Sequence, residues 1–251
     1  MKININNSEL KKKVIEHITN KIPFSITRIG DGEMVILDPT IDKKLTHHML
    51  NRHLGYIPNS NQQQQIKENL SYTILNSNCL SLRKKYPEEL KLWENIPKCY
   101  EKLNLTNKFY FDHDFHFYLM QETNIDEILS VVKNLTIISS RDVTEKLKIK
   151  YPNIKTITYY KIPGEHMFEE NKKIQPYFPE IYEKIYNEIN QKDCSDSLLL
   201  LGGGYVGKRF GVLFKEKGGI SLDIGSVFDF WVGKLTRGIG RGSHSYIKPL
   251  L

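Results

Sequence analysis

The sequence predicts an α/β protein with a mostly parallel sheet and helices on both of its faces, and three observations support this. From residue 108 onward, short apolar segments alternate with segments of helical spacing, which is the order of strand–helix–strand units. The segment SLLLLG (197–202) is continuously apolar, as expected of a strand that is buried on both faces. Glycine-rich or charged motifs follow the predicted strands, where parallel sheets bind ligands: GDGE, SSRD, PGEH, GGGYVGK and DIGS.

The first hundred residues have mainly helical patterns. SELKKKVIEHITNKI (8–22) has the spacing of an amphipathic helix, with Ser8 as its N-cap. The alternating apolar run that follows, FSITRI (24–29), predicts a short strand. Residues 41–105 hold few strand-like runs and carry helical spacing in IDKKLTHHMLNRHL, QQQQIKENLSYTILNS and EELKLWENI. We therefore predict a helical insertion after the first strand.

The second half supplies the remaining elements. Strands are predicted at residues 108–113, 135–140, 154–160, 197–202 and 219–225. Helices are predicted between them at residues 124–134, 141–151, 179–192 and 205–217. No linker interrupts this series, so we expect one domain over residues 1–251, ending in a basic, glycine-rich tail at 235–251.

Size and composition indicate a soluble globular protein. The chain has 251 residues, of which 39% are hydrophobic and 26% charged, enough for one substantial core. No stretch approaches the roughly 18 apolar residues of a membrane helix, and the N-terminus lacks the apolar region of a signal peptide, so we expect a cytoplasmic protein. Cys79, Cys99 and Cys194 are far apart, which predicts reduced thiols and neither a disulfide framework nor a zinc site.

The positive charge suggests an anionic partner. The formal net charge is +7, and the partner could be a phosphorylated ligand, a nucleic acid or an anionic membrane surface. A lysine-rich composition favoured by an AT-rich genome explains the charge equally well. The lysines are spread along the chain without an RNP motif, a zinc finger or a basic block with aromatic residues, so we do not expect nucleic acid as a partner. Peripheral membrane association stays open.

The loop GGGYVGK resembles a dinucleotide fingerprint. Gly202, Gly204 and Gly207 form GxGxxG between a strand and a helix, and Asp223 ends the next strand about 20 residues on, where a ribose-binding acid belongs. The usual fingerprint follows the first strand of its fold, whereas here only one clear strand and a tail come after it. We therefore expect a nucleotide diphosphate or ribose near this loop, with a tight turn that binds nothing as the alternative.

The motif RIGDGE places two carboxylates at the end of the first strand. Asp31 and Glu33 stand two residues apart, which can direct both at one Mg²⁺ or Mn²⁺ ion held jointly with substrate phosphates. Gly30 and Gly32 would permit the turn and the close approach of a ligand. Alternatively, both acids lie in the first turn of a helix and are favoured by its dipole.

Other candidates are less specific. His113, Asp114 and His116 could bind metal or supply a general base, or simply form the polar end of a strand. Glu165 and His166, in IPGEHMF, follow a strand at the expected ligand-binding edge and are acid/base candidates.

Three further features each have two interpretations: two aromatic residues near the C-terminus, the basic tail, and three histidines in the first quarter of the chain. Phe228 and Trp231 could stack a base or sugar, or pack in the core. The tail could fold over an anionic ligand as a lid, or be a frayed terminus. The remaining histidines, on a predicted helix, are expected to be surface or packing residues: His47, His48 and His53.

These motifs together resemble a known family. RIGDGE after a helix and strand, with the late segment LLLLGGGYVGKRFGVLFKEKGGISLDIGSVFDFWVGK, is similar to the bacterial GT-D type glycosyltransferases, long catalogued as a domain of unknown function. The resemblance spans about residues 20 to 235. It implies a Rossmann-like fold, a nucleotide-sugar donor and a divalent metal at the Asp-x-Glu pair, which here is Asp31 and Glu33, with Arg28 nearby. It also implies a donor pocket, to which we assign Ser140, Arg141, Gly202, Gly203, Gly204, Lys208, Asp223, Gly225 and Ser226.

The expected function is a metal-dependent glycosyltransferase. It would use Mn²⁺ or Mg²⁺ to move glucose or galactose from a UDP-sugar to a glycan on a surface glycoprotein or a lipid-linked polysaccharide, in the cytoplasm or at the inner membrane face. Its catalytic candidates are Asp31, Glu33, Arg28, Glu165 and His166. The rival functions are an NAD-dependent oxidoreductase built on GGGYVG and Asp223, and a non-enzymatic module that binds nucleotide or anionic glycan.

Overall fold

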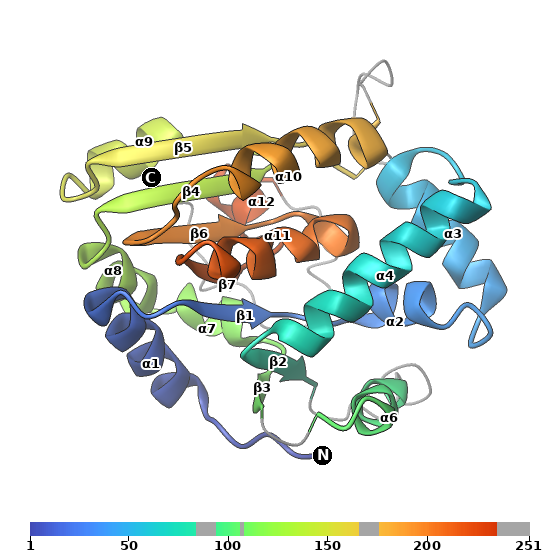
Figure 1. Cartoon of the computed structure of the whole chain (residues 1–251). Coiled ribbons are helices and arrows are strands. Elements are labelled where there is room, and N and C mark those ends of the chain that lie inside the picture. The colour runs from blue at the N-terminus through green and yellow to red at the C-terminus, as the bar shows by residue number, and fades with distance from the viewer. Residues whose placement is uncertain (84–93, 106–107, 166–175, 235–251) are drawn as a thin grey trace.

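The computed structural model describes residues 1–83, 94–105, 108–165 and 176–234. A central sheet of seven strands is covered by helices on both faces (Figure 1). The strands are β1 (Phe24–Thr27), β2 (Cys79–Leu82), β3 (Phe109–Asp112), β4 (Asn134–Ser139), β5 (Thr156–Lys161), β6 (Ser197–Leu201) and β7 (Ile220–Asp223).

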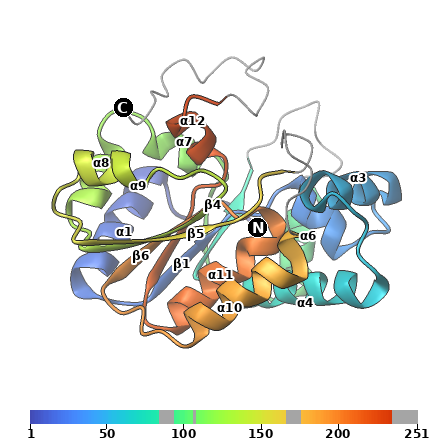
Figure 2. The same ribbon diagram turned by 90° about the horizontal axis from the view of Figure 1, so that it is seen from above.

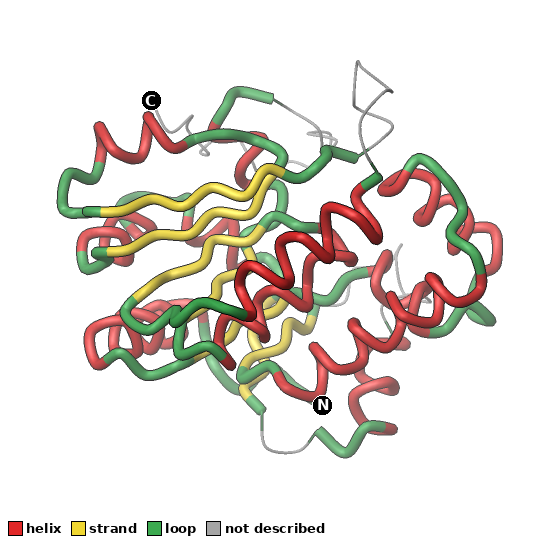
Figure 3. The backbone as a smooth tube through the Cα atoms, turned by 45° about the horizontal axis from the view of Figure 1, so that its top comes forward, coloured by secondary structure: helices red, strands yellow, loops and turns green. Residues whose placement is uncertain are grey.

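The sheet is parallel throughout. Its order is β3-β2-β1-β7-β6-β4-β5, and every neighbouring pair is parallel. Figure 3 shows the strands in yellow, side by side, with helices in red around them. This confirms the predicted α/β class with a Rossmann-like sheet. All four residues of β1, β2 and β7 are buried, as is typical of strands with helices above and below.

One strand was not predicted. The range 41–105, predicted to be a helical insertion, also contributes β2, which lies between β1 and β3. The sequence of β2, CLSL, is too short to show a period and comes directly after a long helix. Three helices of this range are described, α3 (Lys43–Leu54), α4 (Ser60–Asn76) and α6 (Asn95–Lys102), whereas most of EELKLWENI lies outside the described residues.

Two sets of helices enclose the sheet, and Figure 2 shows them on opposite sides. On one face lie α1 (Asn7–Asn20), α7 (Phe115–Leu119), α8 (Asn124–Ser130), α9 (Thr144–Lys150) and α12 (Val227–Trp231). On the other lie α2 (Asp31–Leu37), α3, α4, α6, η3 (Tyr177–Ile181), α10 (Tyr182–Asn190) and α11 (Gly204–Glu216). Each set packs its own apolar cluster against the sheet.

Helix α1 illustrates how local sequence defines an element. Its N-cap is Asn6 and not the predicted Ser8: the Asn6 side chain accepts the Glu9 N–H at 2.9 Å, and Glu9 accepts the Asn6 N–H at 3.1 Å. This reciprocal capping box satisfies two amides that the helix leaves unpaired. The apolar face that the helix buries consists of Leu10, Val14 and Ile18.

The described residues agree with three further expectations. All three cysteines are free thiols. Trp231 and Phe228 are core residues, only 1% and 2% exposed. Within the described ranges, no helix combines the length and the apolar character needed to cross a bilayer.

The strand order creates a crevice at one position. From β1 the chain moves outward through β2 to β3, crosses to the other half of the sheet, and returns to end beside β1 at β7. The segment after β1 leads into α2 on one face of the sheet, whereas the segment after β7 leads into α12 on the other face. Neighbouring connections that diverge in this way open a ligand crevice outside the carboxyl ends of their strands.

Candidate active site

A buried charged cluster lies at the carboxyl ends of β1 and β7. Arg28 follows β1, Asp223 ends β7, and Lys208 projects from the second turn of α11. The Lys208 ammonium donates to Oδ2 of Asp223 at 2.5 Å, and the backbone N–H of Arg28 donates to the same oxygen at 3.1 Å. Lys208 is 6% exposed and Asp223 4%. Charges this deeply buried require partners, and these two residues supply each other's.

Glu33 extends the cluster from helix α2. Its Oε1 lies 3.4 Å from the Lys208 ammonium, and its Oε2 accepts the Gly30 N–H at 2.9 Å, which caps the start of α2. Burial raises the pKa of Glu33, but the Lys208 charge and the Gly30 N–H act in the opposite direction, and the net pKa is below its ordinary value. Glu33 is therefore an anion at neutral pH.

Asp31 differs from Glu33 in its surroundings. It begins α2 and is exposed, and its Oδ1 accepts the Gly32 N–H at 3.0 Å. Both acids thus occupy the first turn of a helix, as the alternative interpretation of RIGDGE required. No group of three or more His, Cys, Asp or Glu side chains in the described part of the chain could hold a metal ion. A metal at this pair would need further ligands from a substrate or water.

His113 fixes the orientation of Arg28. Nη2 of Arg28 donates to Nε2 of His113 at 3.0 Å, and Nε of Arg28 donates to the His113 carbonyl at 3.2 Å. Because a guanidinium only donates, Nε2 must be the acceptor, and the ring proton is assigned to Nδ1, which donates to Oγ of Ser81 at 3.1 Å. Burial, followed by the nearby Arg28 charge, holds the pKa of His113 well below its ordinary value. Neutral His113 is thus a support for Arg28, with both ring nitrogens engaged.

His116 lies beside His113 and Arg28. Its Nδ1 donates to the His113 carbonyl at 3.1 Å, and burial followed by the Arg28 charge lowers its pKa well below the ordinary value. The two histidines of the FDHDFHF motif are therefore neutral and hydrogen-bonded beside Arg28, consistent with the non-catalytic interpretation of this motif.

These side chains line an open cleft of about 740 Å³. Its charged lining comprises three cations and three carboxylates: Arg28, Arg83, Lys208, Asp31, Glu33 and Asp114. Among the described residues that line this cleft, the formal charges cancel. An anionic ligand that enters beside them is therefore better compensated when a cation enters with it.

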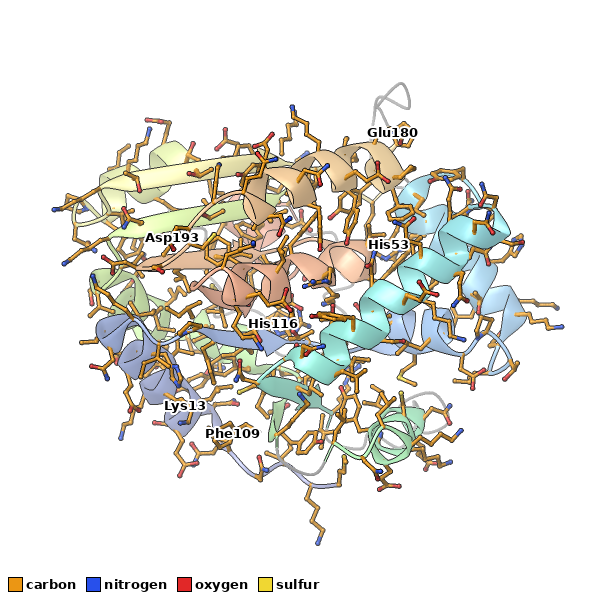
Figure 4. The ribbon with its side chains drawn as sticks, in the orientation of Figure 1. Lys13, His53, Phe109, His116, Glu180 and Asp193 are labelled. Atoms are coloured by element: carbon orange, nitrogen blue, oxygen red, sulfur yellow. The ribbon has the colours of Figure 1, made fainter. Side chains whose placement is uncertain are left out.

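A second cleft of about 630 Å³ adjoins the first, and Ser226 lines both. It brings together most of the predicted donor-pocket residues, namely Ser140, Arg141, Gly202, Gly203, Gly204, Gly225 and Ser226. His53, expected only at the surface or in packing, also lines it and lies beside the start of α11 (Figure 4). The edge of Phe228 completes one wall.

Several polar groups in the second cleft are engaged in ion pairs. Nε of Arg141 donates to Asp229 at 2.7 Å. Glu165, an acid/base candidate, accepts from Nε of Arg52 at 2.6 Å and is therefore engaged in an ion pair. The neighbouring candidate His166 lies outside the described residues, as does the basic tail.

The glycines of GGGYVGK are explained by protein packing. A Cβ at Gly202 would lie 2.6 Å from the Phe228 ring, and one at Gly207 would lie 2.6 Å from the Tyr177 hydroxyl. Gly204 has a φ of +57°, which favours glycine by itself. Asp223, the expected ribose ligand of the dinucleotide interpretation, is paired with Lys208. Both features that suggested NAD thus have partners within the protein, and this disfavours that alternative.

Sequence reasoning missed Arg83 and Ser81. Ser81 lies in the unpredicted strand β2 and is hydrogen-bonded to His113. Arg83 directly follows this strand and lines the first cleft. The available signal was CLSL followed at once by an arginine, because a residue directly after a parallel strand lies at the ligand-binding edge.

Comparison with known proteins supports the fold at low sequence identity. No protein-family model and no curated protein matches the chain. A solved glycosyltransferase (DUF1792) from Streptococcus sanguinis is 15% identical, with a TM-score of 0.54 over 95% of this chain and 92% of that one. A selenomethionine-substituted structure of domain of unknown function 1792 is 16% identical, with a TM-score of 0.52 over 88% of this chain and 77% of that one. The chain therefore has the fold of the DUF1792 structures, which confirms the resemblance to the GT-D type at the level of fold.

Proposed function

We propose that the protein is a glycosyltransferase that uses a nucleotide-sugar donor. The observation that carries this proposal is the pair of adjoining clefts at the β1/β7 crevice, one lined by charged groups and the other by glycines, serines and Phe228. The likeness in fold to a solved glycosyltransferase supports it.

The two clefts suggest how a donor would lie. The nucleoside would occupy the cleft of Ser140 and Gly202–Gly204, and the diphosphate would pass Ser226 into the charged cleft. There Arg28 and Arg83 are the guanidinium groups that can hold phosphate oxygens in a bidentate manner. His113 keeps Arg28 in place before the donor arrives, which lowers the ordering cost of binding.

The carboxylates of Asp31 and Glu33 are suitable ligands for a divalent cation that also binds a phosphate group of the donor. Mg²⁺ and Mn²⁺ take hard oxygen ligands, commonly one or two carboxylates together with substrate phosphates and water. Asp31 is exposed, Glu33 is ionised, and both line the charged cleft. The cancelled charge of this lining also favours a diphosphate that enters with a divalent cation. Bound there, the ion would neutralise charge that develops on the leaving diphosphate.

The finer assignments extend this proposal. Following the family resemblance, the donor would be a UDP-hexose, with glucose or galactose as the sugar, and the acceptor a glycan on a surface glycoprotein or a lipid-linked polysaccharide. The enzyme would act in the cytoplasm, at the inner membrane face where the acceptor is lipid-linked. The +7 net charge is compatible with an anionic surface. Glu165 would act as a base only if its contact with Arg52 opened.

Ligand-induced thermal stabilisation tests the proposal. The melting temperature would be measured with UDP, GDP, CMP and NAD⁺, each with and without Mn²⁺, for wild type, Asp31→Asn and the control Glu16→Gln. Glu16 is exposed on α1, away from both clefts. A nucleotide at a hundred times its Kd stabilises the fold by about 2.7 kcal/mol. We expect a shift with UDP that requires Mn²⁺ and Asp31, followed by transfer from a UDP-hexose; a metal-independent shift with NAD⁺ alone would refute the proposal.

A further inference from the structure

Lys208 contacts two carboxylates within the charged cluster. Its ammonium lies 2.5 Å from Oδ2 of Asp223 and 3.4 Å from Oε1 of Glu33, and its side chain is only 7% exposed. Asp223 is 4% exposed and Glu33 13%. Lys208 also lines the charged cleft together with Asp31. Without any ligand, Lys208 therefore compensates the charge of Glu33, one of the two acids of the Asp-x-Glu pair.

We propose that Lys208 couples metal binding to nucleotide binding, so that the Asp31–Glu33 pair holds a divalent cation firmly only when a diphosphate is present. This inference rests on the proposed function and assigns Lys208 as a positioning residue of the donor site.

In the absence of nucleotide, the Lys208 ammonium already lies close to the Glu33 carboxylate. A divalent cation at Glu33 would stand beside an ammonium that already contacts the same carboxylate. The two cations repel each other, and burial keeps solvent from screening that repulsion. Displacement of Lys208 would not remove the conflict, because the ammonium would lose its partner Asp223 and leave a buried carboxylate uncompensated. Affinity for the metal alone is therefore low.

A diphosphate changes this balance. Its negative charges attract the metal, Lys208 and the guanidinium of Arg28, so that the repulsion between the cations is offset by attraction to a shared anion. Metal and nucleotide then bind with positive coupling. By thermodynamic linkage, each must raise the affinity of the other by the same factor.

A purely structural role for Lys208 makes a different prediction. If the lysine only compensated Asp223, its removal would lower the melting temperature, while the factor by which UDP tightens Mn²⁺ binding would stay unchanged. The two roles are therefore distinguished by the factor by which UDP tightens Mn²⁺ binding. This factor is obtained from the dissociation constants of Mn²⁺ with and without UDP. Calorimetry and the electron paramagnetic resonance signal of free Mn²⁺ measure both constants without an assay of turnover.

Three variants define the experiment. Lys208→Gln removes the ammonium; Lys208→Gln with Asp223→Asn removes the buried ion pair and preserves the net charge of the chain; Lys208→Arg retains a cation as the control. Asparagine at 223 can still accept the Arg28 N–H, and this double variant keeps the test informative if the single variant does not fold.

The expected outcome is a change in coupling. In wild type, UDP should tighten Mn²⁺ binding by about tenfold or more, within the usual range of coupling between sites. In Lys208→Gln and in the double variant, Mn²⁺ should bind the free protein more tightly, and the factor should fall by about fivefold. Lys208→Arg should retain most of it. An unchanged factor in both glutamine variants would overturn this inference alone, whereas no joint binding of Mn²⁺ and UDP to wild type would overturn the proposed function as well.

Discussion

Arg28 donates from Nη2 to Nε2 of His113 at 3.0 Å, which links the end of β1 to the end of β3. The link continues through Nδ1 of His113 to Ser81 of β2, whose hydroxyl also accepts the Ile29 N–H at 2.8 Å. Three adjacent strands thus hold one guanidinium in the charged cleft. For the proposed binding of a diphosphate, such prior positioning lowers the free-energy cost of ordering the side chain.

Replacement of His113 should weaken donor binding more than it weakens the fold. In His113→Phe, Arg28 loses its acceptor, and because hydrogen bonds to charged groups contribute about 1.5–3 kcal/mol, UDP affinity should fall about tenfold or more. His113→Gln, whose carbonyl can still accept, should recover part of this loss. Calorimetric titration with UDP and Mn²⁺, alongside melting temperatures, would measure both effects. Equal UDP affinities in wild type and His113→Phe would contradict this role.

Acidification should destabilise the protein through His113 and His116. Burial and the Arg28 charge hold the pKa of both below the ordinary value of 6.5, so the native state stays neutral while the unfolded chain takes up protons. Their contribution is complete above about pH 6.5 and is lost as the pH falls toward the native pKa, by up to about 1.4 kcal/mol per pH unit for each histidine. Urea unfolding at pH 7, 6 and 5 should show a shallower loss for His113→Gln than for wild type. Identical pH dependences would contradict the assignment.

Much of the fold was predictable because its signal is local. Strands such as β6, which has four buried leucines in succession, can be recognised from five residues of sequence. Strand β2 cannot be recognised in this way, because CLSL follows the seventeen-residue helix α4 and is too short to show a period; its place between β1 and β3 makes it a strand. Tertiary pairing here decides what local sequence leaves open.

That several of the candidate residues lie close together was predictable from the sequence, whereas the hydrogen bonds between them were not. Motif and resemblance assigned Arg28, Glu33, Lys208 and Asp223 to one region, and the structure places them in one cluster. The link from Arg28 to His113 joins residues 85 positions apart and depends on the order of strands in the sheet. No spacing rule along the chain can reveal such a contact.

The two acids of RIGDGE should respond differently to amide substitution. Asp31 is exposed, so Asp31→Asn should change stability by no more than about 0.5 kcal/mol while removing a proposed metal ligand. Glu33→Gln weakens both the cap on Gly30 and the contact with Lys208, and should cost about 1–2 kcal/mol. Denaturant unfolding and Mn²⁺-dependent UDP binding would separate the two roles. A large loss of stability in Asp31→Asn would favour helix capping as the purpose of both acids.

The packing explanation for the GGGYVGK glycines can be tested with Tyr177. Its hydroxyl has no hydrogen-bond partner among the described residues and lies 2.6 Å from where a Cβ at Gly207 would stand. Gly207→Ala should therefore destabilise the fold by about 1–3 kcal/mol through overpacking, despite the better helix propensity of alanine. Tyr177→Phe alone should be nearly neutral, and in that background Gly207→Ala should recover most of the loss, a non-additivity that denaturant unfolding would measure. Gly32→Ala is the matched control, because its nearest neighbour would be Met49 at an ordinary 3.7 Å. If the two changes added independently, the requirement for glycine would lie elsewhere, and the phosphate-approach interpretation of the fingerprint would regain support.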